Sequence, residues 1–146
     1  PHFNSYRRLR PDTHAPTLAS WGYENRTAAI RIPGGDHASR RIEHRVAGAD
    51  ANPYLVVAAI LGAALYGIEN QLVPPDPVRG RAYSERLPKL PADWESAVNA
   101  FEDGEIVPAF FDEALRTMFV ACKRQEIAGF ASNVTDFEFA AYLEII

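Results

Sequence analysis

Residues 27–46, TAAIRIPGGDHASRRIEHRV, carry the clearest signal for strands in this sequence. Thr27–Ile32 is a run of apolar and β-branched residues that stops at Pro33 and a Gly34-Gly35 turn, which is typical of a strand. Arg41–Val46 alternates charged and apolar residues with a period of two, as a half-buried strand does. The stretch therefore predicts two antiparallel strands joined by a loop.

Three charged residues share one face of the second predicted strand. Side chains alternate along a strand, so Arg41, Glu43 and Arg45 point the same way. A carboxylate between two guanidiniums suits a Mg²⁺ ligand beside groups that hold phosphate or carboxylate oxygens. An ion-pair ladder on a solvated face gives the same pattern, and such pairs are common. The pattern alone leaves both interpretations open.

Arg26 and Arg31 precede that strand. Their spacing of five residues sends them to opposite faces of a regular strand. Both reach one ligand only if Arg26 lies in a turn before the strand, and Asn25 favours such a turn. The basic run at residues 7–10 is typical of a solvated surface.

The charge of the chain is unevenly distributed. The 146 residues carry a net charge of −4, but residues 1–46 contribute +4 and residues 47–146 contribute −8. The first segment holds eight arginines and no lysine, which favours a bidentate grip on small anions. The lack of lysines and of interleaved aromatic residues argues against nucleic acid as the partner.

Helices are expected in the second half. Asn52-Pro53 is a helix start, and the uncharged residues 53–68 have apolar side chains all round, which predicts a buried core helix. That run is too short to span a membrane, so no membrane partner is expected. Residues 73–90 predict an irregular connector. Further helices are expected at 92–103, at 108–132 with Cys122 in the core, and from a capping box at 135–138 through Leu143. The fold class is α+β.

Several site types have no support in the sequence. With Cys122 as the one cysteine, an intrachain disulfide is excluded, and a reducing compartment such as the cytoplasm is expected. The histidines lack zinc-site spacing, and no Walker or Rossmann glycine pattern occurs. The chain begins at Pro1 with no signal pattern, so we expect a piece of a longer protein.

Four motifs, in order, resemble the C-terminal catalytic segment of the glutamine synthetase family. They are Asn4-Ser-Tyr-Arg-Arg-Leu9, Asn25-Arg-Thr-Ala-Ala-Ile-Arg-Ile-Pro33, Arg41-Ile-Glu-His-Arg45 and Ala49-Asp-Ala-Asn-Pro-Tyr-Leu55. The resemblance covers roughly the last third of such an enzyme. It implies antiparallel strands from an incomplete catalytic barrel (about 1–50), then a helix (about 53–70), a connector (about 73–91) and C-terminal helices (about 92–146).

The resemblance also implies an activity. Members of the family use ATP and Mg²⁺ or Mn²⁺ to convert glutamate to γ-glutamyl phosphate, which ammonia or an amine attacks, and they assemble as homo-oligomers of stacked rings. Each site residue then has an implied role. Glu43 would bind the metal, Arg31 and Arg41 the ATP phosphates, Arg26 the transferring phosphoryl group, and Arg8 and Arg45 the glutamate.

One position departs from the family pattern. Where glutamine synthetases usually place a glutamate just before Ala-Pro, this chain has His14. An imidazole cannot supply the same anionic site for ammonium. With His14 at this position and the pair Trp21-Gly22, the sequence resembles the γ-glutamylpolyamine synthetase branch, and this resemblance implies an amine acceptor.

Most metal ligands of the family lie outside these residues, so we expect the chain alone to be inactive. The alternative is a non-catalytic module that binds anions or RNA or mediates oligomerisation.

Overall fold

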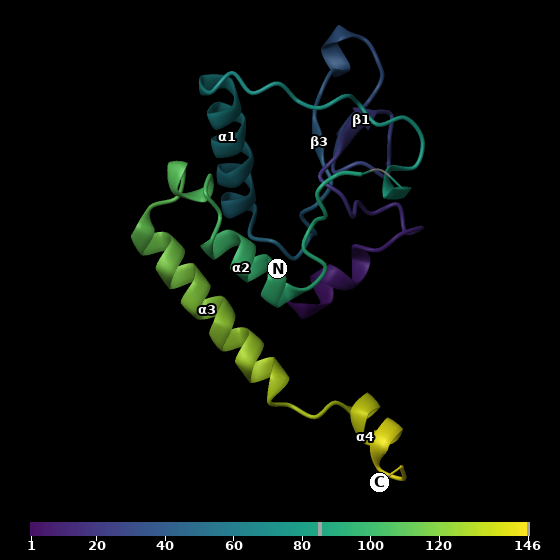
Figure 1. Ribbon diagram of the computed structural model, residues 1–146, viewed down its shortest axis with the longest axis vertical. Helices are drawn as coiled ribbons and strands as arrows, with labels where there is room; N and C mark the ends of the chain where they lie inside the picture. Colours follow the sequence, from purple (N-terminus) through teal and green to yellow (C-terminus); the bar gives the residue numbers. More distant parts are fainter. Residues whose placement is uncertain (85, 146) are drawn as a thin grey trace.

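The computed structural model describes residues 1–84 and 86–145 and combines a small sheet with a helical half (Figure 1). The sheet has the order β1 (Trp21–Tyr23), β2 (Ile30–Ile32) and β3 (Glu43–His44). The longer helices are α1 (Pro53–Glu69), α2 (Trp94–Glu102), α3 (Glu113–Ala131) and α4 (Asp136–Tyr142). Short 3₁₀ turns are η1 (Phe3–Arg8), η2 (His37–Ser39), η3 (Ala82–Ser84) and η4 (Val107–Ala109). The predicted α+β class is confirmed.

The sheet is mixed. β2 and β3 pair antiparallel, as predicted, with Arg31 opposite Glu43. β1, which the sequence reasoning did not predict, pairs parallel to β2. The predicted first strand begins at Ile30 instead of residue 27, because residues 24–29 carry the chain back from the end of β1. Ala28 lies in this returning segment and is fully buried, and its small side chain allows the chain to pass through the interior there.

The core of the helical half lies between α2 and α3. Trp94 and Val98 of α2 pack on Val120 of α3, and all three are buried. The amphipathic helix predicted at 92–103 is thereby confirmed. α3 begins at Glu113 instead of 108, because the Asp112 side chain accepts a hydrogen bond from Leu115 N at 2.7 Å and so caps the helix there.

The prediction that Cys122 lies in the core is wrong. Its side chain is exposed, although its neighbours along α3 have the expected helical spacing. α2 covers the face of α3 that carries Val120, and Cys122 lies on another face, at the edge of an apolar cleft.

The last predicted helix forms with its capping box. Thr135 Oγ1 accepts from Glu138 N at 3.2 Å, and Thr135 N donates to the Glu138 carboxylate at 2.9 Å. α4 projects away from the rest of the molecule at the end of α3 (Figure 1).

The prediction that residues 53–68 form a buried helix is half right. The helix forms, capped by the Asn52 side chain, but no residue of α1 is buried, and Tyr54 and Ile68 are 84% and 73% exposed. An apolar surface all round a helix needs cover on every side, and the described residues cover α1 on one side only. None of the described helices is long and apolar enough to cross a membrane.

Two glycines of α1 give opposite predictions for stability. A Cβ on Gly62 would lie 2.5 Å from Cβ and Cγ of Phe110, whereas a Cβ on Gly67 would have nothing within 4 Å among the described residues. Gly62→Ala should lower the free energy of unfolding by about 1–3 kcal/mol through overpacking. Gly67→Ala should raise it by about 0.5–1 kcal/mol, because alanine favours the helix. Denaturant unfolding of both variants checks this, and changes of equal sign would contradict it.

Candidate functional site

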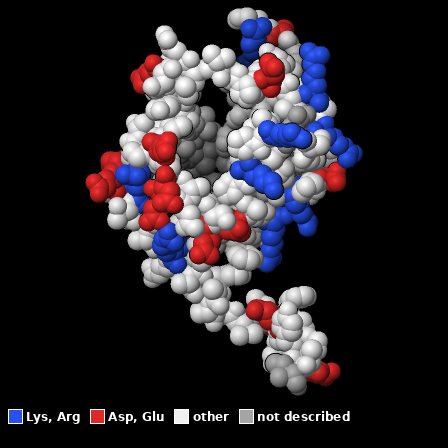
Figure 2. Space-filling view, in the orientation of Figure 1, with Lys and Arg blue, Asp and Glu red and all other residues white. Residues whose placement is uncertain are grey.

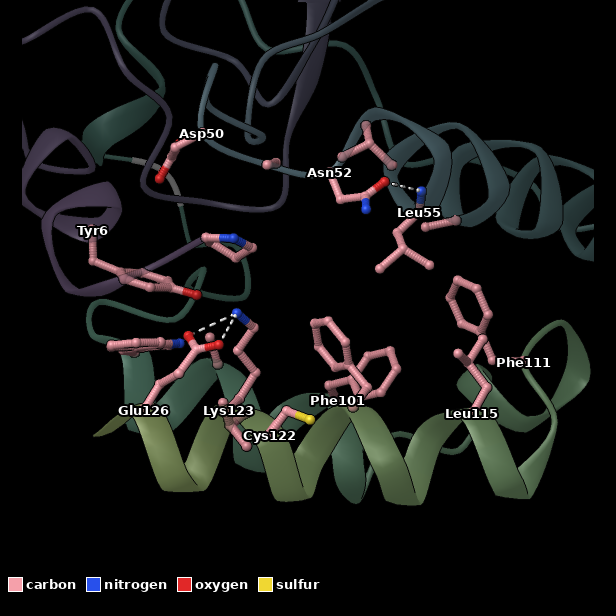
Figure 3. A pocket seen from close by; sticks show the side chains of 18 residues that line it. Tyr6, Asp50, Asn52, Leu55, Phe101, Phe111, Leu115, Cys122, Lys123 and Glu126 are labelled. Carbon is pink, nitrogen blue, oxygen red and sulfur yellow. Dashed lines mark hydrogen bonds and ion pairs between the residues drawn. The ribbon is translucent and has the colours of Figure 1, made fainter. Parts of the chain in front are cut away.

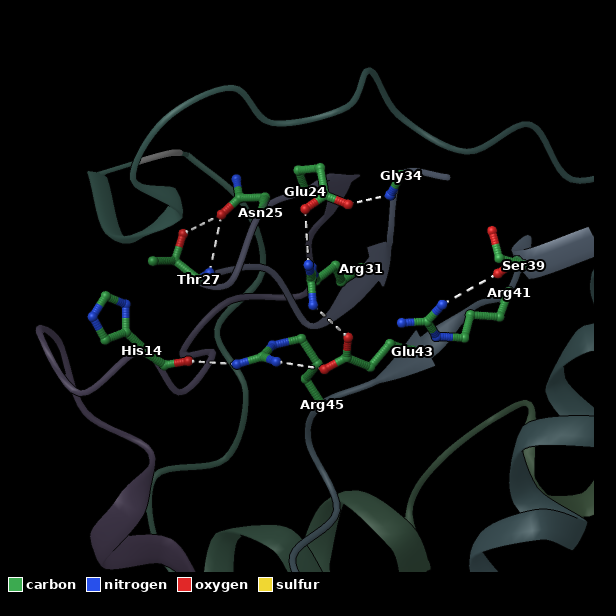
Figure 4. A network of polar contacts seen from close by, with 10 residues as sticks. All are labelled: His14, Glu24, Asn25, Thr27, Arg31, Gly34, Ser39, Arg41, Glu43 and Arg45. Atoms are coloured by element: carbon green, nitrogen blue, oxygen red, sulfur yellow. Dashed lines mark hydrogen bonds and ion pairs between the residues drawn. The ribbon is translucent and has the colours of Figure 1, made fainter. Parts of the chain in front are cut away.

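The Glu43 carboxylate lies between two guanidiniums at the open edge of the sheet (Figure 4). Arg45 Nη1 donates to Glu43 Oε1 at 2.7 Å, and Arg31 Nη1 donates to Glu43 Oε2 at 2.9 Å. The pairing of β2 with β3 places Arg31 opposite Glu43, so the sheet register itself builds this contact. Each carboxylate oxygen is thereby bonded to a different arginine.

A second carboxylate holds Arg31 from the other side. Glu24 accepts from Arg31 Nη2 at 2.8 Å, and its other oxygen accepts from the Gly34 backbone N–H (Figure 4). The sequence reasoning missed Glu24. The signal available was its place directly before Asn25-Arg26, at the end of β1. Glu24 and Glu43 together fix both terminal nitrogens of the Arg31 guanidinium.

These contacts determine the protonation of the network. The hydrogen bond from Arg45, and then that from Arg31, lower the pKa of Glu43 below its ordinary value of 4.5. The Gly34 N–H, and then Arg31, lower the pKa of Glu24 in the same way. The hydrogen bond to Glu24 is the main cause that raises the pKa of Arg31. Both carboxylates are therefore held ionised at neutral pH.

The network extends to the N-terminal segment through backbone carbonyls. Arg45 Nη2 donates to the His14 carbonyl at 2.8 Å. Arg8 donates to the carbonyls of Arg45 and Val46, at 3.3 Å and 2.6 Å. Arg8 and Arg45 thus lie at one end of the sheet. They are the two residues that the resemblance assigns to glutamate, and Arg8 stabilises the backbone that follows β3.

Arg41 does not join the network. The contact of Arg45 with Glu43 agrees with the prediction that these two side chains share a face. Arg41 forms no hydrogen bond or ion pair with Glu43 among the described residues, so its place on that face stays a prediction, although its charge helps to lower the pKa of Glu24. Its guanidinium donates to the Ser39 carbonyl at 3.2 Å (Figure 4). The second arginine on Glu43 is Arg31, from the neighbouring strand.

His14 and Arg26 line one cavity of about 610 Å³. Arg26 lies in the turn that follows β1, as its spacing from Arg31 predicts. His14 lies in a loop, where its φ is +57°. The far wall is the connector, at Val78, Arg79 and Gly80. Glu24 also lines the cavity, but its carboxylate already accepts from Arg31 and from the Gly34 N–H. Arg26 and Arg79 outnumber this one acidic side chain, so the cavity suits an anion.

The surface charge follows the same division as the sequence. Figure 2 shows arginine and lysine side chains gathered on the half of the molecule that holds the sheet, and acidic side chains mainly over the helical half. The arginines of residues 1–46 contribute to this basic half, together with Arg79 and Arg81 of the connector. The electrostatic field therefore favours anions at the sheet.

The carboxylates do not by themselves complete a metal site. Among residues 1–84 and 86–145, no three His, Cys, Asp or Glu side chains come together as ligands. A divalent cation takes about six oxygen ligands, and Glu43 supplies one carboxylate whose two oxygens already accept from arginines. The described residues can therefore supply one side chain to a divalent-metal site but cannot form the whole site.

A separate cleft of about 560 Å³ opens between α1 and the α2–α3 pair (Figure 3). Aromatic and aliphatic side chains such as Phe101, Phe111 and Leu115 line its interior, and Lys123 and Glu126 form an ion pair at one end. Tyr6 also lies at that end, and burial is the main cause that raises its pKa. The cleft contains none of the predicted site residues.

The stability of the sheet should depend on pH through Glu43. Because the folded state lowers the pKa of Glu43 below 4.5, the ionised network stabilises the fold above that pH, and this contribution is lost as pH falls through the folded pKa. The wild type should therefore melt at a higher temperature than Glu43→Gln at about pH 7, and the difference should shrink below pH 4.5.

The matched control is Glu105→Gln, since Glu105 is exposed and forms no hydrogen bond or ion pair with a described residue. Thermal melts over a pH series check the prediction. A Tm difference between wild type and Glu43→Gln that persists unchanged in acid would contradict it.

The family described as "Glutamine synthetase, catalytic domain" matches residues 1–142. Among curated proteins, the chain is 41% identical over 138 residues to gamma-glutamylputrescine synthetase of Escherichia coli and 40% identical over 149 residues to glutamate–isopropylamine ligase of a Pseudomonas species. These alignments cover 94% and 100% of this chain, and 29% and 32% of those proteins.

Among solved structures, the chain superposes on an apo structure of GmaS with a TM-score of 0.81 at 34% identity, covering 99% of this chain and 33% of that one. The chain thus spans about a third of the length of the relatives it matches. On the family match, the identities and the shared fold, the chain belongs to the glutamine synthetase family.

Proposed function

We propose that the chain is the C-terminal portion of the catalytic domain of an ATP-dependent ligase that joins glutamate to a primary amine. The reaction converts the γ-carboxylate of glutamate to an acyl phosphate, and the amine then displaces phosphate to form the amide. Both steps build negative charge on phosphoryl oxygens, so the protein's task is to place cations around them.

The observation that carries the proposal is the arrangement of guanidiniums around Glu43 beside the cavity of His14 and Arg26. Arg31 and Arg45 are held by hydrogen bonds of 2.7–2.9 Å to fixed carboxylates, so their positions are set before an anion arrives. Such preorganisation lowers the cost of stabilising charge in the transition state. We assign Arg31 and Arg41 to the ATP phosphates, Arg26 to the transferring phosphoryl group, and Arg8 and Arg45 to glutamate.

Glu43 is the residue of this chain that we propose as a ligand of Mg²⁺ or Mn²⁺. The family uses ATP and divalent metal generally, and when bound the ion would neutralise phosphate charge. One carboxylate oxygen would have to leave its arginine to reach the ion. The remaining ligands would come from outside the described residues. We further propose that the whole protein forms a homo-oligomer of stacked rings.

The acceptor follows from His14. An anionic side chain at this position would bind ammonium, whereas the imidazole of His14 offers no fixed negative charge. Three relatives at 38–41% identity are by name a gamma-glutamylputrescine synthetase, a gamma-glutamylethanolamide synthetase and a glutamate–isopropylamine ligase, and several glutamine synthetases match at 36–38%. The somewhat higher identity to the three amine enzymes supports an amine in place of ammonia as the acceptor.

The full-length protein should use putrescine with a higher kcat/KM than ammonium in a coupled assay with ATP and glutamate. His14→Glu should raise kcat/KM for ammonium relative to putrescine by about tenfold, because a carboxylate supplies the charge that ammonium needs. His37→Glu, in the exposed 3₁₀ turn η2 and outside the lining of the cavity, is the control and should leave the ratio unchanged. Higher specificity of the wild type for ammonium would contradict the amine assignment.

The 146-residue chain alone should show no ligase activity, because its described residues supply one of the ligands that a divalent ion needs. Glutamate-dependent phosphate release from ATP by the purified chain is the measurement. Turnover above a no-protein blank would contradict the prediction, and salt-sensitive RNA binding without nucleotide dependence would favour the non-catalytic module.

A further inference from the structure

Two buried polar side chains form hydrogen bonds between the turn that carries Arg26 and the connector. Asn25 and Thr27, the residues on either side of Arg26, are each only 9% exposed. Arg26 itself is exposed and has no hydrogen-bond or ion-pair partner among residues 1–84 and 86–145. Its position therefore depends on the backbone of the turn, which its two neighbours control.

Asn25 uses every hydrogen-bonding position of its amide. Its Nδ2 donates to the carbonyls of Val78 and Gly80 at 3.0 Å and 2.9 Å. Its Oδ1 accepts from the Thr27 backbone N–H at 3.0 Å and from the Thr27 hydroxyl at 2.7 Å (Figure 4). An asparagine amide has two donor hydrogens and two acceptor lone pairs, so none is left free. This requires asparagine specifically, since aspartate would turn an oxygen toward two carbonyls.

Thr27 completes the connection. Its Oγ1 accepts from the backbone N–H of the buried Ala82 at 2.9 Å while donating to Asn25. Residues 78–82, more than fifty positions along the chain, are thereby bonded to the turn at three points. Gly22 permits this approach, because a Cβ there would lie 2.6 Å from the Val78 carbonyl oxygen.

The same connector segment forms the wall of the cavity that faces Arg26. Val78, Arg79 and Gly80 line it together with His14 and Arg26. The Asn25–Thr27 pair thus fixes the turn that bears Arg26 and the opposite wall with one set of hydrogen bonds. Buried, fully paired polar groups are rigid, and breaking one leaves the others unsatisfied.

We propose that Asn25 and Thr27 are positioning residues for Arg26. Their hydrogen bonds to residues 78–82 fix the backbone of the turn, and this keeps the Arg26 guanidinium at the position in the cavity from which it acts. The inference rests on the proposed function of Arg26 in phosphoryl transfer. Small displacements of a group that stabilises a transition state lower kcat strongly. Binding of ATP and glutamate, which we assign to other arginines, should change little.

A double-mutant cycle in the full-length protein tests this. Thr27→Val keeps the shape of the side chain but removes the hydroxyl, Thr27→Ser keeps the hydroxyl, and Arg26→Ala removes the guanidinium. Thr27→Val should lower kcat by about tenfold with KM for ATP and glutamate within twofold, and Thr27→Ser should restore most of the rate. In the Arg26→Ala background, which is itself slower by about 10²-fold or more, Thr27→Val should have less than a twofold further effect.

A purely structural role would give a different result. Thr27→Val would then lower kcat by the same factor with and without Arg26, and this outcome overturns the inference, as does a wild-type kcat for Thr27→Val. Thr117→Val, at an exposed position of α3, is the matched control for removing a threonine hydroxyl and should leave kcat unchanged. If Thr27→Val does not fold by circular dichroism, Thr27→Ala takes its place in the same cycle.

Failure of the inference is distinguishable from failure of the proposed function. A wild-type rate for Arg26→Ala removes Arg26 from the reaction and overturns both. A slow Arg26→Ala enzyme with additive or absent effects of Thr27→Val leaves the proposed function standing and overturns the positioning role alone.

Discussion

The shared carboxylate of Glu43 is the interaction on which the site depends. It joins β2 to β3 through Arg31 and, through Arg45, reaches the backbone of the loop that carries His14. Two guanidiniums that would repel each other are held near one point because an anion lies between them. The chain therefore supplies internally the negative charge that keeps its cationic groups in place. Glu24 adds to it on the other side of Arg31, where its carboxylate accepts from Arg31 and from the Gly34 N–H.

A second constraint operates without charge. The turn after β1 and the connector are far apart in sequence, and both are irregular, so neither can pair its backbone groups within a helix or strand ladder. Asn25 and Thr27 satisfy those groups instead. Buried backbone carbonyls and N–H groups nearly always find partners, and here the partners come from residues that flank Arg26. The same requirement that stabilises the loop thus places a functional side chain.

The helical half shows how far a local pattern determines packing. The capping residues Asn52 and Thr135 begin their helices as the sequence predicts, because a cap depends on a few adjacent residues. The burial of α1 and of Cys122 was predicted from apolar neighbours and is wrong. Apolar periodicity identifies a surface that needs cover, but what lies against that surface is decided by segments distant in the chain.

Much of this protein follows from local chemistry: the α+β class, the starts of α1 and α4, the turn at Asn25-Arg26, the concentration of arginine in residues 1–46 and the family motifs. Each of these depends on neighbouring residues or on composition. The spacing within one strand predicts that Arg45 lies beside Glu43, but the second partner, Arg31, is set by the register of β2 on β3 and emerges only in three dimensions. The tertiary structure likewise decided that β1 joins the sheet in parallel and that the connector closes the cavity of His14 and Arg26. Contacts between segments about 50 residues apart leave no periodic signal in a single sequence, so they had to be observed.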